Sequence, residues 1–243
     1  MTAHRRVVLG AVVAGVALVA TGCAEQLGLP ESTTEQGDTV GRVFDLYLVA
    51  AYVVAAIVVG LIAFILLRFR AGRRSGPASQ THHNAPLEIL YTVVPLLLVG
   101  ALTAVTLVTI GDVAADEPDP DVTIDVEGYQ WGWRFTYVDE GITVATDADG
   151  GPEVVLPAPA RIRFTVHSED VIHSLWIPAF RFKRDLIPGT TTSFTVDTDE
   201  LGTFPGKCAE YCGLQHTTMT FTARTVAPDE FEAWKAETEA GTS

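Results

Sequence analysis

The chain contains the stretch Cys208-Ala209-Glu210-Tyr211-Cys212-Gly213-Leu214-Gln215-His216-Thr217-Thr218-Met219. It supplies four soft or borderline metal-ligand side chains, those of Cys208, Cys212, His216 and Met219. Thiolate and thioether sulfur favour copper(I), and imidazole also binds copper(II), so the mixture suits a redox copper better than a structural zinc. One thiolate with histidine and methionine would describe a blue-copper site. Two thiolates can bridge two copper ions, so that one unpaired electron spreads over both ions. The geometry of the site would then change little when the electron leaves.

Two other interpretations of the cysteines stay open at this point. Cys208 and Cys212 could form a short disulfide in an exported protein, or they could hold zinc together with His216 and a distant fourth ligand. Neither interpretation accounts for Met219, nor for His173, which lies in the largely apolar stretch 170–180. A lone histidine there would ordinarily be a satisfied core residue. Together with the downstream cluster, His173 supplies the missing ligand.

Short alternating segments around these residues predict an all-β domain. Apolar and polar residues alternate within 122–126, 133–138, 154–156, 162–166, 192–196 and 219–225, with Gly, Pro and Asp between the segments. Repeated short strands of this kind indicate a β-sandwich or barrel. Pro228-Asp229-Glu230 and the amphipathic residues that follow predict a capped C-terminal helix.

Two apolar runs precede this domain. Leu46 to Leu67 and Ile89 to Ile110 each have 22 residues, enough for a transmembrane helix. The loop of about 68–87 contains Arg68, Arg70, Arg73 and Arg74 and no acid, which predicts that it is cytoplasmic. We therefore expect an external linker over 23–42, a transmembrane hairpin over 43–111 and an external domain over 112–243.

Residues 1–22 predict an export signal. A basic start, His4-Arg5-Arg6, is followed by an apolar run from Val7 to Val19 that is too short to span a bilayer. Small residues directly before Cys23 resemble a bacterial lipoprotein cleavage box, in which Cys23 would become the lipidated first residue. Ala20 stands where that pattern usually has Leu, so an ordinary cleaved signal is the alternative.

Charge is distributed unevenly along the chain. The whole chain has a formal net charge of −14, and from Asp112 onward 24 acids face 9 bases. Such a negative field disfavours nucleic acid and favours a basic protein partner. The alternative is that the acidic residues only keep the domain soluble and bind no partner.

From the hairpin to the last helix, the chain resembles subunit II of a bacterial haem-copper cytochrome c oxidase of the aa3 type. The resemblance rests on Tyr129-Gln130-Trp131-Gly132-Trp133, on Asp170-Val171-Ile172-His173-Ser174 and on Cys208-x-Glu210-x-Cys212-x3-His216-x2-Met219, in that family's order. It implies a cupredoxin fold, a Greek-key sandwich or barrel, that holds a binuclear copper centre called CuA.

The resemblance also implies a set of metal ligands. Cys208 and Cys212 would bridge both copper ions, and His173 and Met219 would complete one of them. The other copper would be completed by His216 and the backbone carbonyl of Glu210. The Glu210 side chain would bind a magnesium ion shared with subunit I, a carboxylate role that suits magnesium. The alternative is that the Glu210 side chain is solvated and binds no metal.

Two residues outside the metal cluster receive roles from the same resemblance. Trp131 would be the exposed tryptophan at which electrons arrive from cytochrome c, although clustered aromatic residues in a β-domain usually belong to the core. Glu88, within Asn84 to Thr92, would lie at the mouth of a proton path into subunit I. An acid in the first turn of a helix is also favoured by the helix dipole alone, and Tyr91 stands where the family commonly has tryptophan. His82 and His83 are expected to be solvated.

The expected function is that of the electron-input subunit of a proton-pumping respiratory oxidase in a bacterial cell membrane. Electrons would come from cytochrome c, or from a cytochrome c domain of a neighbouring complex, and would pass to haem held only by subunit I, where dioxygen is reduced. Subunit III is a further expected partner. Family members that oxidise quinols lack the copper cysteines. The alternatives are a membrane-anchored cupredoxin outside any oxidase, and a nitrous oxide reductase, which needs a large second copper domain.

Overall fold

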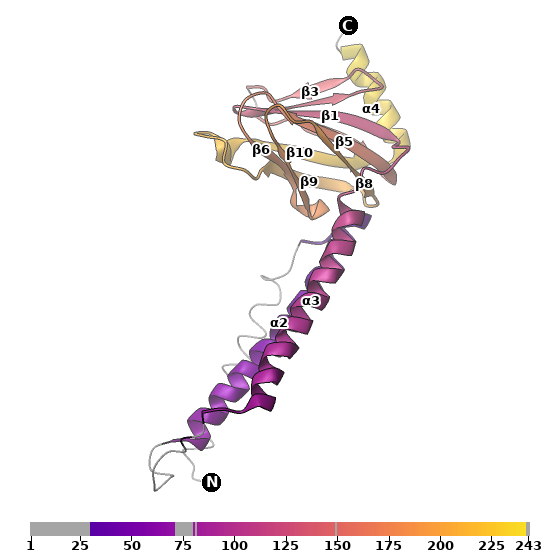
Figure 1. Cartoon of the computed structure of the whole chain (residues 1–243). Coiled ribbons are helices and arrows are strands. Elements are labelled where there is room, and N and C mark those ends of the chain that lie inside the picture. Colours follow the sequence, from indigo (N-terminus) through magenta and orange to yellow (C-terminus); the bar gives the residue numbers. More distant parts are fainter. Residues whose placement is uncertain (1–29, 71–79, 81, 149, 242–243) are drawn as a thin grey trace, which may run out of the picture. The chain divides into compact units, whose positions relative to one another are not determined.

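In the computed structural model, the described residues are 30–70, 80, 82–148 and 150–241. They form two long helices, a β-domain and a last helix, α4 (Pro228–Gly241) (Figure 1). The predicted signal segment 1–22, Cys23, and Arg73 and Arg74 of the loop lie outside the described residues. Predictions that concern these residues are therefore not tested by the structure.

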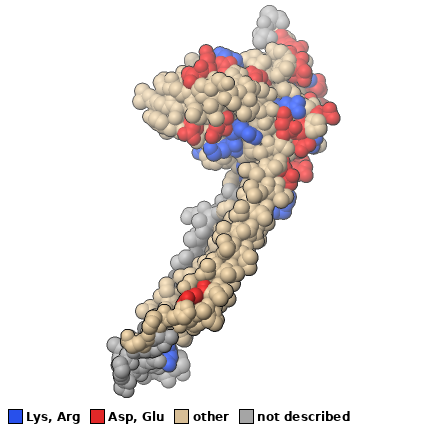
Figure 2. All heavy atoms as spheres, in the orientation of Figure 1, with Lys and Arg blue, Asp and Glu red and all other residues tan. Residues whose placement is uncertain are grey.

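The two apolar runs lie within α2 (Glu35–Arg68) and α3 (Ala85–Val113). Both helices are long and apolar enough to cross a membrane, and Figure 2 shows their surface as almost free of charge. The Tyr47 hydroxyl donates to the Leu102 carbonyl at 3.0 Å, so the helices lie side by side. This pair is the predicted helical hairpin.

The helix α2 begins at Glu35, inside the stretch 23–42 that was predicted to be an external linker. Thr34 caps the helix, because its side chain accepts a hydrogen bond from the Gly37 amide. Glu35 and Asp38 in the first turn further favour this start, since they complement the positive end of the helix dipole.

The β-domain is a sandwich of two five-stranded sheets. In the first, the order is β3 (Thr143–Ala145), β2 (Gly132–Tyr137), β1 (Val122–Tyr129), β5 (Ala160–Ser168) and β8 (Thr192–Thr198). In the second, the order is β4 (Glu153–Pro157), β10 (Thr220–Val226), β9 (Gly202–Cys208), β6 (His173–Ile177) and β7 (Phe182–Leu186). The strand order is not sequential, and one parallel pair occurs in each sheet, β1 with β5 and β4 with β10. The predicted cupredoxin-like sandwich is confirmed.

Alternation in the sequence identified most of the strands but not all. The six alternating segments coincide with β1, β2, β4, β5, β8 and β10 to within one residue or overlap them, and the stretch around His173 contains β6. Alternation did not reveal β3, β7 or β9. Pro205 and Gly206 argue against a strand at β9, yet Gly206 is needed there, because a Cβ at that position would lie 2.2 Å from the Phe221 ring.

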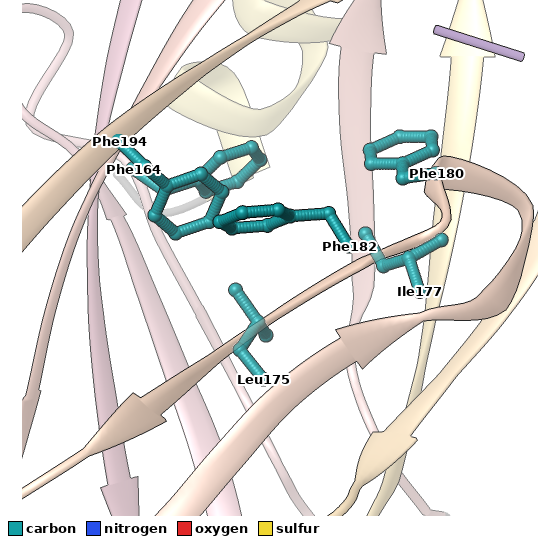
Figure 3. A pocket seen from close by; sticks show the side chains of 6 residues that line it. All are labelled: Phe164, Leu175, Ile177, Phe180, Phe182 and Phe194. Carbon is teal, nitrogen blue, oxygen red and sulfur yellow. The ribbon is translucent and has the colours of Figure 1, made fainter. Parts of the chain in front are cut away.

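The sheets enclose a core of aromatic and branched side chains. Trp133, Phe135 and Tyr137 of β2 are fully buried, and the Tyr137 hydroxyl both donates to the Val155 carbonyl at 2.8 Å and accepts from its amide at 2.9 Å. Figure 3 shows a small cavity lined by six apolar side chains, those of Phe164, Leu175, Ile177, Phe180, Phe182 and Phe194. A cavity with such a lining is expected to stay dry.

Strand β8 contacts the chain at both ends of the hairpin. Gln36 in the first turn of α2 exchanges two hydrogen bonds with Asp197, each 2.9 Å long. After α3, Asp116 accepts from the Ser193 hydroxyl at 2.7 Å and from the Arg163 guanidinium at 2.7 Å. The start of α2 and the segment that follows α3 therefore contact the same strand.

Candidate metal centre

The predicted ligand side chains come together at one end of the second sheet. His173 is the first residue of β6, Cys208 is the last residue of β9, and Met219 directly precedes β10. The Cys208 amide donates to the Met219 carbonyl at 3.0 Å and so closes the loop that carries Cys212 and His216. Hydrogen bonding between strands thus places residues from distant parts of the chain side by side.

The two sulfur atoms lie at the centre of the cluster. Cys208 Sγ and Cys212 Sγ are 3.9 Å apart, and both cysteines are free, so the disulfide alternative does not hold in the structure. Each sulfur has its own imidazole: His173 Nδ1 lies 3.9 Å from Cys208 Sγ, and His216 Nδ1 lies 3.6 Å from Cys212 Sγ. Met219 Sδ is 3.8 Å from Cys212 Sγ.

This donor set fits a pair of copper ions better than a single zinc. A structural zinc has four ligands, whereas six donors gather here, because the Glu210 carbonyl oxygen also lies 3.2 Å from Cys208 Sγ. The ligand atoms of His173, Cys208 and Cys212 all lie within 4.8 Å of one another, and all three residues are buried. The buried thioether of Met219 further favours copper, since it is a soft donor. Two ions that share the thiolates would use every donor.

The two thiols differ in acidity. Burial opposes ionisation of Cys208, but its contacts, led by that with the His173 ring, lower the pKa of this thiol to about 6. Burial and the nearby Cys208 sulfur raise the pKa of Cys212 to about 12. The first thiolate of the pair therefore forms more readily on Cys208 than on Cys212. A bound cation is needed to deprotonate Cys212, as is usual for a metal-coordinating thiol.

His173 is fully buried and fixed on two sides. Asp170 Oδ1 lies 2.9 Å from its Nε2, and the ring of Trp133 packs edge-on with centroids 6.3 Å apart. The proton therefore belongs on Nε2, which leaves Nδ1, the nitrogen facing Cys208, free for a metal. From the sequence alone, Asp170 had no expected role beyond its place in a motif, and the available signal was a carboxylate three residues before a candidate ligand.

Trp131 lies directly against the loop that carries Cys212. Its Nε1 donates to the Cys212 carbonyl at 3.3 Å. Gly213, with φ at +125°, makes this approach possible, because a Cβ there would lie 3.2 Å from the Trp131 ring. Trp131 is half-buried, whereas Trp133, two residues later, is fully buried. Only Trp131 of this pair is thus both accessible and in contact with the metal loop.

The two predicted glutamates have different surroundings. The Glu210 side chain is exposed beside the cluster, while its carbonyl faces Cys208. Glu88 lies in the first turn of α3, where its carboxylate accepts from the Asn84 amide at 2.9 Å and the Asn84 side chain accepts from the Leu87 amide at 3.3 Å. This reciprocal cap gives Glu88 a structural role. His83 Nδ1 lies 3.2 Å from the same carboxylate, so this exposed histidine has a partner.

Comparisons with known proteins identify the family. Residues 22–108 match the family model described as the transmembrane domain of cytochrome c oxidase subunit II, and residues 143–226 match the periplasmic domain of the same subunit. A probable cytochrome c oxidase subunit 2 of Streptomyces coelicolor is 33% identical, over 94% of this chain and 85% of the relative. This chain belongs to the cytochrome c oxidase subunit II family. The predicted resemblance is therefore confirmed, and the chain is a subunit of an oxidoreductase.

Other relatives of this oxidase subunit carry the same name. Cytochrome c oxidase subunit 2 of Cereibacter sphaeroides is 32% identical, over 82% of this chain and 75% of the relative. Among solved structures, the periplasmic domain of subunit II of cytochrome oxidase from Bradyrhizobium japonicum is 32% identical, with a TM-score of 0.48, and the match covers 52% of this chain and 99% of that structure.

Proposed function

We propose that this oxidase subunit accepts electrons from cytochrome c at a binuclear copper centre and passes them to haem in subunit I, where dioxygen is reduced to water and protons are pumped. The observation that carries the proposal is the cluster of six donors around two free, buried thiols. The bound copper pair would supply a one-electron redox centre.

The protein holds its ligands in place for that centre. The side chains of Cys208, Cys212, His173, Met219 and His216 and the carbonyl of Glu210 would hold the copper pair. The three ligands Cys208, Cys212 and Met219 are at most 5% exposed, so water is largely excluded. Ligands that are packed and hydrogen-bonded keep their positions whether the centre is oxidised or reduced.

The donor protein would bind over the copper loop. Tyr211 and Leu214 of this loop are 76% and 87% exposed, and the half-buried ring of Trp131 lies beside Gly213. This apolar surface belongs to a domain with many acidic groups, several of which gather in red clusters in Figure 2. A negative field speeds the encounter with a basic donor such as cytochrome c. Electrons would therefore arrive through Trp131.

The remaining assignments concern the membrane, the partner subunits and the start of the chain. The hairpin would anchor the chain in a bacterial cell membrane, with the domain 112–243 on the outer face and the loop of about 68–87 in the cytoplasm. The exposed side chain of Glu210 would bind magnesium shared with subunit I, and Glu88 would lie at the mouth of a proton path. Residues 1–22 would be removed as a signal, with Cys23 lipidated. Subunit III would be a further partner.

Purification of the native complex in mild detergent tests the oxidase assignment. We expect a polytopic, haem-bearing subunit to copurify with this chain, and we expect reduced cytochrome c to reduce that haem. A chain that binds copper and exchanges electrons but never copurifies with a haem protein would contradict the assignment. Such a result would support a membrane-anchored cupredoxin instead.

A further inference from the structure

Asp170 contacts both the proposed copper ligand His173 and the segment that carries Trp131. Its Oδ1 accepts from His173 Nε2 at 2.9 Å. Its Oδ2 accepts from the backbone amide of Gln130 at 2.7 Å, and Gln130 directly precedes Trp131. One carboxylate thus joins the turn before β6 to the turn between β1 and β2.

The same segment is also fixed to the other side of the metal cluster. The Gln130 side-chain amide donates to the Cys212 carbonyl at 2.6 Å, and Trp131 Nε1 donates to the same oxygen at 3.3 Å. Residues 130–131 are therefore hydrogen-bonded to His173 through Asp170 and to Cys212 directly. The tryptophan and two of the ligands form one connected frame.

Asp170 is itself held by local hydrogen bonds. Its amide donates to the Ser168 hydroxyl at 3.3 Å, and its Oδ1 also accepts from the Val171 amide at 2.6 Å. Aspartate is suited to such turns, because its short side chain reaches neighbouring backbone amides. Its side chain is 32% exposed, whereas that of His173 is fully buried. The carboxylate is thus already oriented toward the buried imidazole.

We propose that Asp170 is a positioning residue that fixes His173 for copper binding and, at the same time, holds Trp131 against the copper loop. This inference rests on the proposed function. A carboxylate on Nε2–H orients the imidazole and makes Nδ1 a stronger ligand, and loss of such a partner typically lowers metal affinity about 10- to 100-fold. The second oxygen accepts a hydrogen bond from the Gln130 amide, so loss of the carboxylate removes the contacts with both His173 and Gln130.

Two substitutions of Asp170 separate its two contacts. Asp170→Ala removes both, and we expect copper affinity to fall about 10- to 100-fold and reduction by cytochrome c to slow. Asp170→Asn retains one acceptor oxygen. With copper on Nδ1, His173 Nε2 carries a proton, so the asparagine oxygen must face His173 and its NH₂ group cannot accept from Gln130. We therefore expect Asp170→Asn to recover copper affinity and a native EPR spectrum, but to remain slow in reduction by cytochrome c.

Glu169→Gln is the matched control, since it removes a negative charge next to Asp170 and keeps the contacts with His173 and Gln130. All variants are measured as full-length chains in the purified complex, by copper titration, by the nitrogen hyperfine coupling in EPR and by stopped-flow reduction, with thermal unfolding as the check of folding. We expect Glu169→Gln to keep the copper affinity and spectrum of the unsubstituted chain.

The inference is overturned if both Asp170 variants match Glu169→Gln in copper affinity, hyperfine coupling and reduction rate while the unsubstituted chain holds its copper pair. If the unsubstituted chain binds no copper pair, the proposed function fails instead. Should Asp170→Ala not fold, the comparison of Asp170→Asn with Glu169→Gln decides, because equal reduction rates of these two would exclude the contact with Gln130.

Discussion

Cys212→Ser is expected to abolish the binuclear centre and to lower the rate of reduction by cytochrome c by at least about 100-fold. Cys212 Sγ lies within 3.9 Å of Cys208 Sγ, His216 Nδ1 and Met219 Sδ, so it is the ligand atom that contacts the other three ligand side chains of the loop. A serine hydroxyl is a harder and far less acidic donor that does not bridge copper(I). The copper content of the purified chain and stopped-flow kinetics measure the two effects.

Thr217→Ser is the matched control for this substitution, since it changes an exposed residue of the same loop that offers no donor to the cluster. It should keep both the copper content and the reduction rate. A Cys212→Ser chain that still binds two copper ions and is reduced at the normal rate would show that Cys212 is not a bridging ligand.

Trp131→Ala is expected to slow reduction by cytochrome c about 100-fold, as when a reacting group is misplaced, while leaving copper content and spectrum intact. The half-buried ring donates through its Nε1 to the Cys212 carbonyl at 3.3 Å and so links the surface to the copper loop. Without the ring, electrons from cytochrome c would lose this hydrogen-bonded route to the copper loop. Reduction rates at rising donor concentration separate weaker docking from slower electron transfer.

Trp176 offers a control for the loss of a tryptophan. It is also half-buried, lies on β6, and has its ring 4.7 Å from the Lys207 ammonium. Trp176→Ala should leave the reduction rate unchanged, and Trp131→Phe should give an intermediate rate, because it keeps a ring but loses the hydrogen bond. Equal slowing by Trp131→Ala and Trp176→Ala would remove the specific role of Trp131.

The ligands of the candidate centre could be predicted from the sequence because their chemistry is local. Thiol, imidazole and thioether groups close together in one loop indicate a soft metal wherever the loop lies. His173 was harder, since a single histidine in an apolar strand has no distinctive pattern. It became a candidate only beside the cysteine loop, and the pairing of β6 with β9 now accounts for their proximity.

Features that depend on backbone geometry could not be predicted in the same way. Trp131 and Trp133 look alike in the sequence, yet the turn before β2 leaves one half-buried against Gly213 and buries the other. The link from Asp170 to the Gln130 amide joins turns 40 residues apart and has no pattern of its own. The strand β9 was missed because Pro205 and Gly206 usually interrupt strands.

The copper content and EPR spectrum of the oxidised, full-length chain test the central claim most directly. The cluster of six donors around two free thiols predicts two copper ions per chain, with one unpaired electron shared equally between them. A single copper with a blue-copper spectrum, or a single zinc in its place, would contradict the proposed centre.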